Sequence, residues 1–502
     1  MKRLIVSVFI FILLLTPITA WATPPGFSGG VNNEYEYEEI VFITGEPIKF
    51  VGTLTVKEKE KAEEKSVSYS YKLISEDKSL KGKLDRTITL ITTLDKRNDK
   101  GQTIGNTTLD KYKETIKLGK DKYELVKDGG YELSKSDVID NRPASDFYSG
   151  NLKARKYYKI NKDEGEVIVD ISGGNVGYKN FWGSTETEIL DYTITSNRQT
   201  EEKDGKTNEN SWHGTVKVQV SDSLTKTLKY SDNEATFSSF YGGHVRVTNQ
   251  EMVSRYDYNL PRVDDREIND RRRERYAIEL RKKMVPKVER LIIPKFKDIG
   301  GHWAEEYIKK LYSLDVFDEN SVFFTPDVPF TRGEFTKGVM RVCNIRPSLE
   351  DMKKPSRRRG KQPKEVSPFK DVPVNDPDYK YIKDAIEKKI ISGVTKDLFK
   401  PDKPLTKAQA ITILIKALGF ESKAPTPGFY TSFTDDNKIP NWAKDSIYMA
   451  KEIGLIHGDN YNRINPNKNI TRAESSEMLV RFLEFLQKDL QRDYRENIIN
   501  FN

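Results

Sequence analysis

Three basic side chains occupy the same position in a phrase that recurs near the C-terminus. The copies read Thr331-Arg332-Gly333-Glu334, Thr406-Lys407-Ala408-Gln409 and Thr471-Arg472-Ala473-Glu474. Each Thr precedes a Glu or Gln by three residues and opens an apolar run, which predicts a capping box at a helix start. A cation in the first turn opposes the helix dipole, but beside free N–H groups it is well arranged to hold a carboxylate or phosphate. We therefore expect anion binding here, with solvated side chains as the alternative.

The phrase ends the shared part of a longer unit that occurs three times over roughly sixty residues each. The shared residues upstream are Phe296, Asp298, Trp303 and Pro326 in the first copy, Phe369, Asp371 and Pro401 in the second, and Phe433, Asp435, Trp442, Gly458 and Pro466 in the third. Such a fixed order indicates internal repetition. Each copy reads as helix, loop, helix, and a unit this small should bury its apolar faces by packing against the others.

This unit resembles the S-layer homology domain, which occurs in threes on exported bacterial proteins. The resemblance implies an all-α, pseudo-threefold bundle whose inter-unit grooves bind an anionic, peptidoglycan-linked secondary cell-wall polysaccharide, commonly through a pyruvate ketal. The Arg of the repeated phrase would meet the ketal carboxylate, and the Asp and Trp of the first half would shape the groove. The residues to which the resemblance assigns ligand contact are Asp298, Trp303, Arg332, Asp371, Lys407, Asp435, Trp442, Gly458 and Arg472.

Departures from the family pattern rank the three copies. In the second copy Pro377 stands at the Trp position, with Tyr379 as a substitute. Lys407 keeps the charge but loses the bidentate fork of Arg, and we expect its groove to lack a Trp. In the first copy Asp315 and Glu319 stand where the third has glycine, and a carboxylate would repel an anionic ligand. The third copy, with its Arg, therefore ranks first.

The N-terminus predicts export. Residues 1–3 include two basic side chains, residues 4–15 are almost wholly apolar, and Ala20-Trp21-Ala22 matches a small-residue cleavage site. This pattern is typical of a signal peptide cleaved after Ala22. The apolar run is short for a spanning helix, and we expect no membrane span after cleavage.

The sequence pattern of residues 23–260 predicts a region of β-strands. Apolar and polar residues alternate in segments such as 67–73 and 215–220, and Gly- and Asn-rich turns lie between such segments. Period-two alternation rich in β-branched and aromatic residues favours antiparallel sheets, in one large or two smaller domains. Residues 261–295 mix Arg clusters with acids, and we interpret them as a charged, partly helical linker, with a polyanion-binding helix as the alternative.

The expected organisation is therefore an N-terminal all-β part followed by a C-terminal all-α bundle. The boundaries are a signal peptide at 1–22, a β-rich region at 23–260, a linker at 261–295, repeats at 296–345, 369–421 and 433–487, a basic insert at 346–368 and a tail at 488–502.

Other chemistry has little support in the sequence. The four histidines, His213, His244, His302 and His457, are scattered without metal-ligand spacing, and Cys343 lies on an apolar helix face, which predicts a buried, inert thiol. We find no nucleophile elbow or phosphate loop, and expect no catalytic residues, metal, cofactor or nucleic-acid partner. Trp182, Trp212 and Tyr241 could stack on sugars, but core packing is the stronger interpretation.

Two functions remain open. The first is a non-enzymatic surface protein, anchored by the repeats and displaying the β-rich region as a structural or binding module. The second is a wall-anchored polysaccharide hydrolase with its active site in residues 23–260. The absence of a catalytic motif favours the first.

Overall fold

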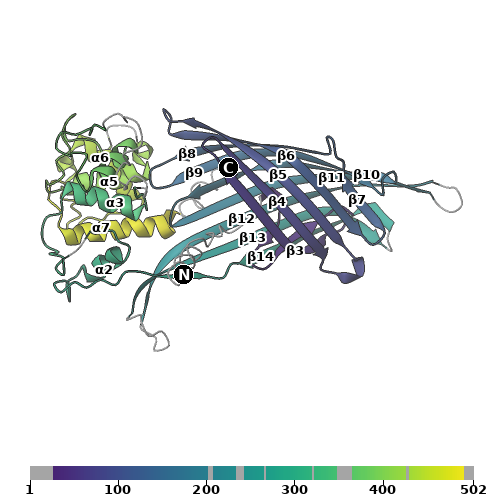
Figure 1. The fold of residues 1–502 in the computed structure, drawn as a ribbon, viewed down its shortest axis with the longest axis horizontal. Coiled ribbons are helices and arrows are strands. Elements are labelled where there is room, and N and C mark those ends of the chain that lie inside the picture. The colour runs from purple at the N-terminus through teal and green to yellow at the C-terminus, as the bar shows by residue number, and fades with distance from the viewer. Residues whose placement is uncertain are drawn as a thin grey trace, which may run out of the picture.

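The computed structural model describes residues 26–201, 207–232, 242–264, 267–318, 321–347, 365–425 and 429–490. The predicted signal peptide, most of the basic insert and nearly all of the tail lie outside these ranges. Within them a long β-sheet precedes a group of helices, and Figure 1 shows the helices gathered at one end of the sheet.

The β-part is one antiparallel sheet of fifteen strands. Its strands are β1 (Val31–Asn32), β2 (Tyr37–Val41), β3 (Ile48–Glu60), β4 (Glu64–Ser75), β5 (Lys83–Arg97), β6 (Gln102–Leu118), β7 (Asp121–Leu125), β8 (Tyr131–Asn141), β9 (Asp146–Ile160), β10 (Gly165–Lys179), β11 (Gly183–Glu201), β12 (Thr207–Ser231), β13 (Gly243–Asp264), β14 (Glu267–Lys283) and β15 (Lys287–Arg290). Most neighbours in the sheet are consecutive in sequence, as expected for hairpin connections. The predicted all-β class is confirmed, as one sheet rather than two domains.

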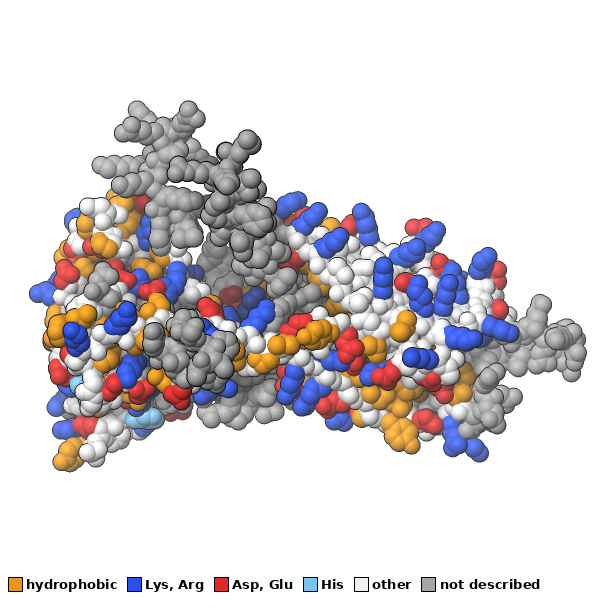
Figure 2. Space-filling model, turned by 60° about the horizontal axis from the view of Figure 1, so that its bottom comes forward, with side chains coloured by type: hydrophobic (Ala, Val, Ile, Leu, Met, Phe, Trp, Pro, Cys, Tyr) orange, Lys and Arg blue, Asp and Glu red, His pale blue; other side chains and the backbone are white. Residues whose placement is uncertain are grey.

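The sheet curves, so that its first and last strands share one core. Phe42, which follows β2, contacts Tyr256 and Tyr258 of β13, with ring centroids 5.7 and 5.9 Å apart. Alternate residues of the strands point into this core, while the outer face is polar, as the period-two pattern predicts. In Figure 2, Lys and Arg side chains interspersed with Asp and Glu cover much of the sheet surface.

A chain of ion pairs lies inside this core. Arg86 of β5 donates to both carboxylate oxygens of Glu39 at 2.7 and 2.9 Å and to Glu114 at 2.8 Å. Lys156 of β9 reaches the second oxygen of Glu114 at 3.1 Å. Burial raises the pKa of Glu114, but the neighbouring cations outweigh this and hold it at about 2. The charges balance across four strands, which is what burying them requires.

The predicted helical linker at 261–295 is wrong, because residues 267–283 form strand β14. This strand pairs with β13 over its length, with Tyr258 opposite Tyr276 and Tyr256 opposite Ile278. It is the last strand in the order of hydrogen-bonded neighbours across the sheet. Charged side chains are a common protection for edge strands against pairing with other chains. The Arg clusters thus mark a sheet edge, and they hide the alternation that would have identified it.

The helical part contains α2 (Glu305–Ser313), α3 (Arg332–Val342), α4 (Tyr379–Glu387), α5 (Lys407–Leu418), α6 (Asn441–Glu452) and α7 (Arg472–Glu484), two for each repeat, and a π-turn, η5 (Phe485–Asp489), continues α7. Helices in the C-terminal part were predicted, and this is confirmed. Their apolar faces form one core. Cys343 is buried in it, and burial raises the pKa of its thiol to about 12, as expected for an inert cysteine.

Candidate functional site

Each repeat begins its second helix with the predicted capping box. The Thr hydroxyl accepts a hydrogen bond from the backbone N–H three residues on, and the Glu or Gln side chain accepts one from the Thr N–H. The pairs are Thr331 with Glu334, Thr406 with Gln409 and Thr471 with Glu474. The boxes position the next residue, which is the repeated cation, in the first turn of α3, α5 and α7.

The residues before these caps are joined in a closed ring of backbone hydrogen bonds. Phe330 N–H donates to the carbonyl of Ile470 at 2.9 Å, Ile470 N–H to Leu405 at 3.0 Å, and Leu405 N–H to Phe330 at 3.0 Å. Each repeat therefore contacts both of the others at equivalent positions. The repetition in sequence is matched by a cyclic repetition of contacts.

Each cation-bearing residue contacts the next repeat in cyclic order: the first repeat contacts the second, the second the third, and the third the first. The backbone N–H of Arg332 donates to Lys403 at 3.0 Å, that of Lys407 to Lys468 at 2.9 Å, and that of Arg472 to Val328 at 2.9 Å. In the same order α3 packs against α4, α5 against α6, and α7 against α2. Each junction thus brings the cation of one copy against the first half of the next.

Arg332 faces the second repeat without an acidic partner. Its guanidinium lies 4.9 Å from the ring centroid of Phe399 and donates from Nη2 to the carbonyl of Ser392 at 2.8 Å. Among the described residues its buried Nε–H has no hydrogen-bond partner, and no carboxylate pairs with it. Burial lowers the pKa of Arg332. The group is therefore a desolvated cation with a donor to spare.

Lys407 faces the third repeat in a similar state. It is half-buried, and no hydrogen bond or ion pair joins its ammonium to another described residue. Burial lowers its pKa, an effect only partly offset by the charge of Glu474. A half-buried ammonium that no described acid contacts directly is a ready partner for an anion.

Arg472 differs, because an acid already neutralises it. Its guanidinium lies 4.5 Å from the ring centroid of Phe324 and 5.4 Å from that of Phe330. Nη1 donates to Oε1 of Glu334 at 2.9 Å. Glu334 is the capping-box acid of the first repeat, so a carboxylate already lies against this cation.

The three motif aspartates hold turns. Each accepts two backbone N–H groups, one on each carboxylate oxygen, at 2.6–3.0 Å. The donors are Phe324 and Thr325 for Asp298, Phe399 and Lys400 for Asp371, and Ile464 and Asn465 for Asp435. Burial raises the pKa of Asp298, but the backbone donors outweigh it and the net shift is downward. Their oxygens point to the backbone. Asp298 and Asp371 fix the turns that carry the rings beneath Arg472 and Arg332.

The motif tryptophans lie at the surface. Trp303 is 55% exposed before α2, and Trp442 is 56% exposed on α6. Tyr379, the predicted substitute in the second repeat, is buried, and its hydroxyl donates to Glu365 at 3.1 Å. It therefore presents no ring to a ligand.

Gly458 has a structural reason to be glycine, since a Cβ there would lie 2.7 Å from Cα of Asn462. Asp315 takes the left-handed conformation (φ 55°) that Gly454 takes at the matching position (φ 70°). Its carboxylate pairs with Arg346 at 2.7 Å. Glu319 lies outside the described residues.

The expectation that Lys407 has no Trp in the repeat that it faces is wrong. Lys407 faces the third repeat, which carries Trp442, and Arg472 faces the first, which carries Trp303. Arg332 faces the second repeat, where no Trp stands. Sequence reasoning also missed Glu334 as a partner of Arg472 and the rings under the arginines. Phe324 and Phe399 were visible in the repeated phrase but had no assigned role.

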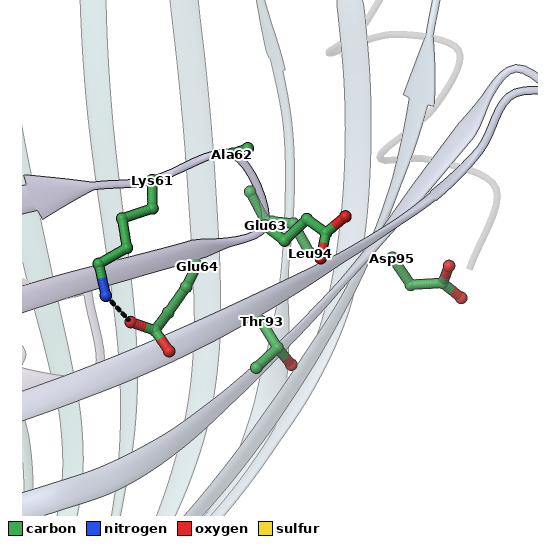
Figure 3. Close-up of a pocket in the computed structure, with 7 residues that line it drawn as sticks. All are labelled: Lys61, Ala62, Glu63, Glu64, Thr93, Leu94 and Asp95. Carbon is green, nitrogen blue, oxygen red and sulfur yellow. Dashed lines mark hydrogen bonds and ion pairs between the residues drawn. The ribbon is translucent and has the colours of Figure 1, made fainter.

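The structure gives little support to the alternative sites in the sheet, which are the sugar-stacking aromatics and a catalytic pair of carboxylates. Trp182 and Trp212 are buried, so neither offers a face to a sugar, and Tyr241 lies outside the described residues. A recess of about 520 Å³ is lined by Lys61, Ala62, Glu63, Glu64, Thr93, Leu94 and Asp95. Figure 3 shows Glu64 directed toward Lys61, 3.3 Å away, while Asp95 points in another direction. These carboxylates do not face one another as a hydrolytic pair must.

The described residues also bear on metal binding and on crossing a membrane. No group of three or more His, Cys, Asp or Glu in this part of the chain is arranged to hold a metal ion. No helix among the same residues combines the length and apolarity that crossing a membrane would need.

Comparison with protein families identifies the repeats. The profile of the S-layer homology domain matches residues 295–336, 368–411 and 432–474. An endoglucanase of a Bacillus species is 34% identical over 135 residues, which is 26% of this chain and 14% of that protein. The surface-layer 125 kDa protein of Lysinibacillus sphaericus is 33% identical over 119 residues, 23% of this chain and 10% of that protein. The cellulosome-anchoring protein of Acetivibrio thermocellus is 34% identical over 98 residues, 20% of this chain and 22% of that protein.

The chain thus spans less than a quarter of the length of each of these relatives. The likeness to the endoglucanase extends over too little of that enzyme to bring an activity with it.

Proposed function

Because the chain carries three S-layer homology domains, which locate it at the cell wall and cell surface, we propose that these domains hold it there without a covalent bond. Their ligand is an anionic secondary cell-wall polysaccharide, bound through the carboxylate of a pyruvate ketal. The observation that carries the proposal is the pair of desolvated cations, Arg332 and Lys407, at junctions between repeats and free of acidic partners among the described residues.

The three repeats act as a pseudo-threefold bundle. The ring of backbone hydrogen bonds through Phe330, Leu405 and Ile470 supports this symmetry, as does the cyclic packing of the helices. Each groove then takes its cation from one repeat and its turn from the next, and the grooves of Lys407 and Arg472 also take an exposed Trp from that next repeat.

The three grooves contribute unequally to binding the polysaccharide. Lys407 offers a point charge beside the repeat that carries Trp442, whose exposed ring can stack on a sugar. Arg332 offers a cation over Phe399 that no described acid neutralises. Arg472 is already paired with Glu334, so an anionic ligand there meets a competing carboxylate. Asp298, Asp371, Asp435 and Gly458 act indirectly, by holding the turns, and Trp303 lines the groove of Arg472.

Residues 1–22 serve as an export signal, and the curved sheet is the module displayed at the surface. The sheet has a structural or partner-binding role rather than a catalytic one. The buried tryptophans and the diverging carboxylates of the recess at Glu64 support this choice over a hydrolase.

The test uses the mature full-length protein and purified cell-wall sacculi. The protein should pellet with sacculi that carry their polysaccharide and stay in solution once that polymer is chemically removed. Addition of a pyruvylated fragment should release the bound protein, whereas the same fragment without its ketal should not. Equal pelleting with stripped sacculi would contradict polysaccharide binding.

A further inference from the structure

One end of the sheet meets the C-terminal ends of all three second helices. The indole Nε1–H of Trp182 donates to the carbonyl of Val342 on α3 at 2.7 Å. The backbone N–H of Ala144 donates to Ala417 on α5 at 2.9 Å. The side-chain amide of Asn180 donates to Leu486, in η5 at the end of α7, at 3.4 Å. Three donors from two neighbouring turns of the sheet thus reach one carbonyl on each helix.

These carbonyls are the groups that a helix leaves without partners. The last four C=O groups of an α-helix have no intrahelical donor and carry the negative end of its dipole. Here the turns between β8 and β9 and between β10 and β11 supply donors to them. The sheet therefore supplies one capping donor to each helix, and at α3 and α5 this adds to the donors from the residues that follow the helix.

Apolar contacts surround these hydrogen bonds. Phe147 of β9 lies between Tyr178 and Phe420, at 6.4 Å from each ring centroid, and Phe420 lies 6.2 Å from Phe485. Trp182, 2% exposed, packs in the same core as the helices. These rings form one row from the sheet into the repeats, which a flexible tether between independent domains would not need.

The helix ends are shaped to fit the sheet. Gly419 ends α5 with φ 70°, and a Cβ there would lie 2.5 Å from Cδ of Arg142 in the β8–β9 turn. On the first repeat, Oγ of Ser313 at the end of α2 lies 3.5 Å from Nδ1 of His244 on β13. Contacts thus reach all three repeats at the same pole.

We infer that this rim of the sheet is a built docking surface for the C-terminal pole of the three repeats, so that sheet and repeats form one rigid body. The cations Arg332, Lys407 and Arg472 begin the same helices, and so lie at the opposite pole. Helices of 11, 12 and 13 residues separate the poles by about 16–20 Å at 1.5 Å per residue. Figure 1 shows α7 running toward the sheet, as this arrangement requires.

The consequence for the cell surface rests on the proposed function. If the cation-bearing pole holds wall polysaccharide, the sheet is directed away from the attachment point at a fixed angle, rather than swinging on a linker. The docking itself needs no ligand, so it can be tested apart from wall binding.

The experiment measures distances between spin labels in the full-length protein without polysaccharide. One label replaces Lys162 in the exposed β9–β10 turn, and the other replaces Lys396 on the second repeat. A second pair, at Lys162 and Lys111, lies wholly on the sheet and supplies the width expected of a rigid body. Native Cys343 is buried with a raised thiol pKa and does not compete for the label.

We expect a single distance peak across the two parts, no more than about twice as wide as the reference peak. Substituting Trp182→Ala together with Phe420→Ala should broaden it severalfold, whereas Trp212→Ala, in the separate core of the sheet, should not. A broad or multiple distribution in the protein without these substitutions would overturn the inference, whatever the variants do. An unchanged width in the Trp182 and Phe420 variant, with its helix content intact, would overturn the assignment of the surface.

Discussion

Removing the repeated cations one at a time should reverse the ranking that motif quality suggests. Arg332→Ala deletes a cation that no carboxylate of the described residues neutralises and that a ligand carboxylate could therefore pair with. Hydrogen bonds to charged groups contribute roughly 1.5–3 kcal/mol, so affinity for a pyruvylated fragment should fall about tenfold to a hundredfold. Lys407→Ala removes a point charge without a fork and should cost about tenfold.

Arg472→Ala should cost the least. A ligand that binds Arg472 competes with Glu334, which lies 2.9 Å away, and to that extent exchanges one ion pair for a similar one. Such exchanges are worth about 0–1 kcal/mol, or less than about fivefold in affinity. The capping threonines are untouched by all three substitutions, so the helices should keep their caps.

Glu334→Gln supplies the matched control. Gln409 already completes the same capping box in the second repeat, so glutamine should cap α3 as well. The change removes the competing carboxylate, and we expect higher affinity and a larger penalty for a subsequent Arg472→Ala. This coupling is what a double-mutant cycle measures.

Isothermal titration with the pyruvylated fragment gives each affinity, and thermal unfolding checks that each variant is folded. The reasoning fails if Arg472→Ala is the most damaging of the three with Glu334 in place. It also fails if Glu334→Gln leaves the effect of Arg472→Ala unchanged, because Glu334 would then not compete with the ligand.

Three further predictions concern stability. Arg86→Leu leaves the carboxylates paired with it buried without their counter-ion and should lower the free energy of unfolding in urea by about 3–5 kcal/mol. Arg155→Leu, the control, breaks an exposed pair and should lower it by at most about 1 kcal/mol. Equal losses in the two variants would contradict the buried network. Burial raises the pKa of Glu188 to about 8, so the folded state binds this proton more tightly than the unfolded chain, and stability falls as pH rises from about 4.5 to 8. Glu188→Gln should remove that decline in denaturation curves measured across this pH range. An unaltered decline would show that another group binds the proton. Thr406→Ala removes a cap and should lower stability by about 1 kcal/mol in thermal unfolding, whereas Thr395→Ala, exposed in a loop, serves as the control and should have no comparable effect.

Local patterns were enough to predict the β-class and several of the strands. Residues 67–73 of β4 and 215–220 of β12 alternate apolar and polar residues, and alternation depends only on the pleat of the backbone. The three capping boxes were predicted residue by residue, because their partners lie three residues apart in the chain. Strand β14 was missed because the charges that suit an edge replace the apolar residues on which the pattern depends.

In the candidate site, too, the sequence predicted the local features, and tertiary contacts decided the rest. The sequence was sufficient to identify Arg332, Lys407 and Arg472 and to assign each to the first turn of a helix, since both depend on neighbours within four residues. It could not show which repeat each cation faces, because that depends on contacts between segments about 60 to 140 residues apart. Only the packed structure joins Arg472 to Glu334 and leaves Arg332 without an acid, and it is this difference in counter-ions, rather than the motif itself, that ranks the grooves.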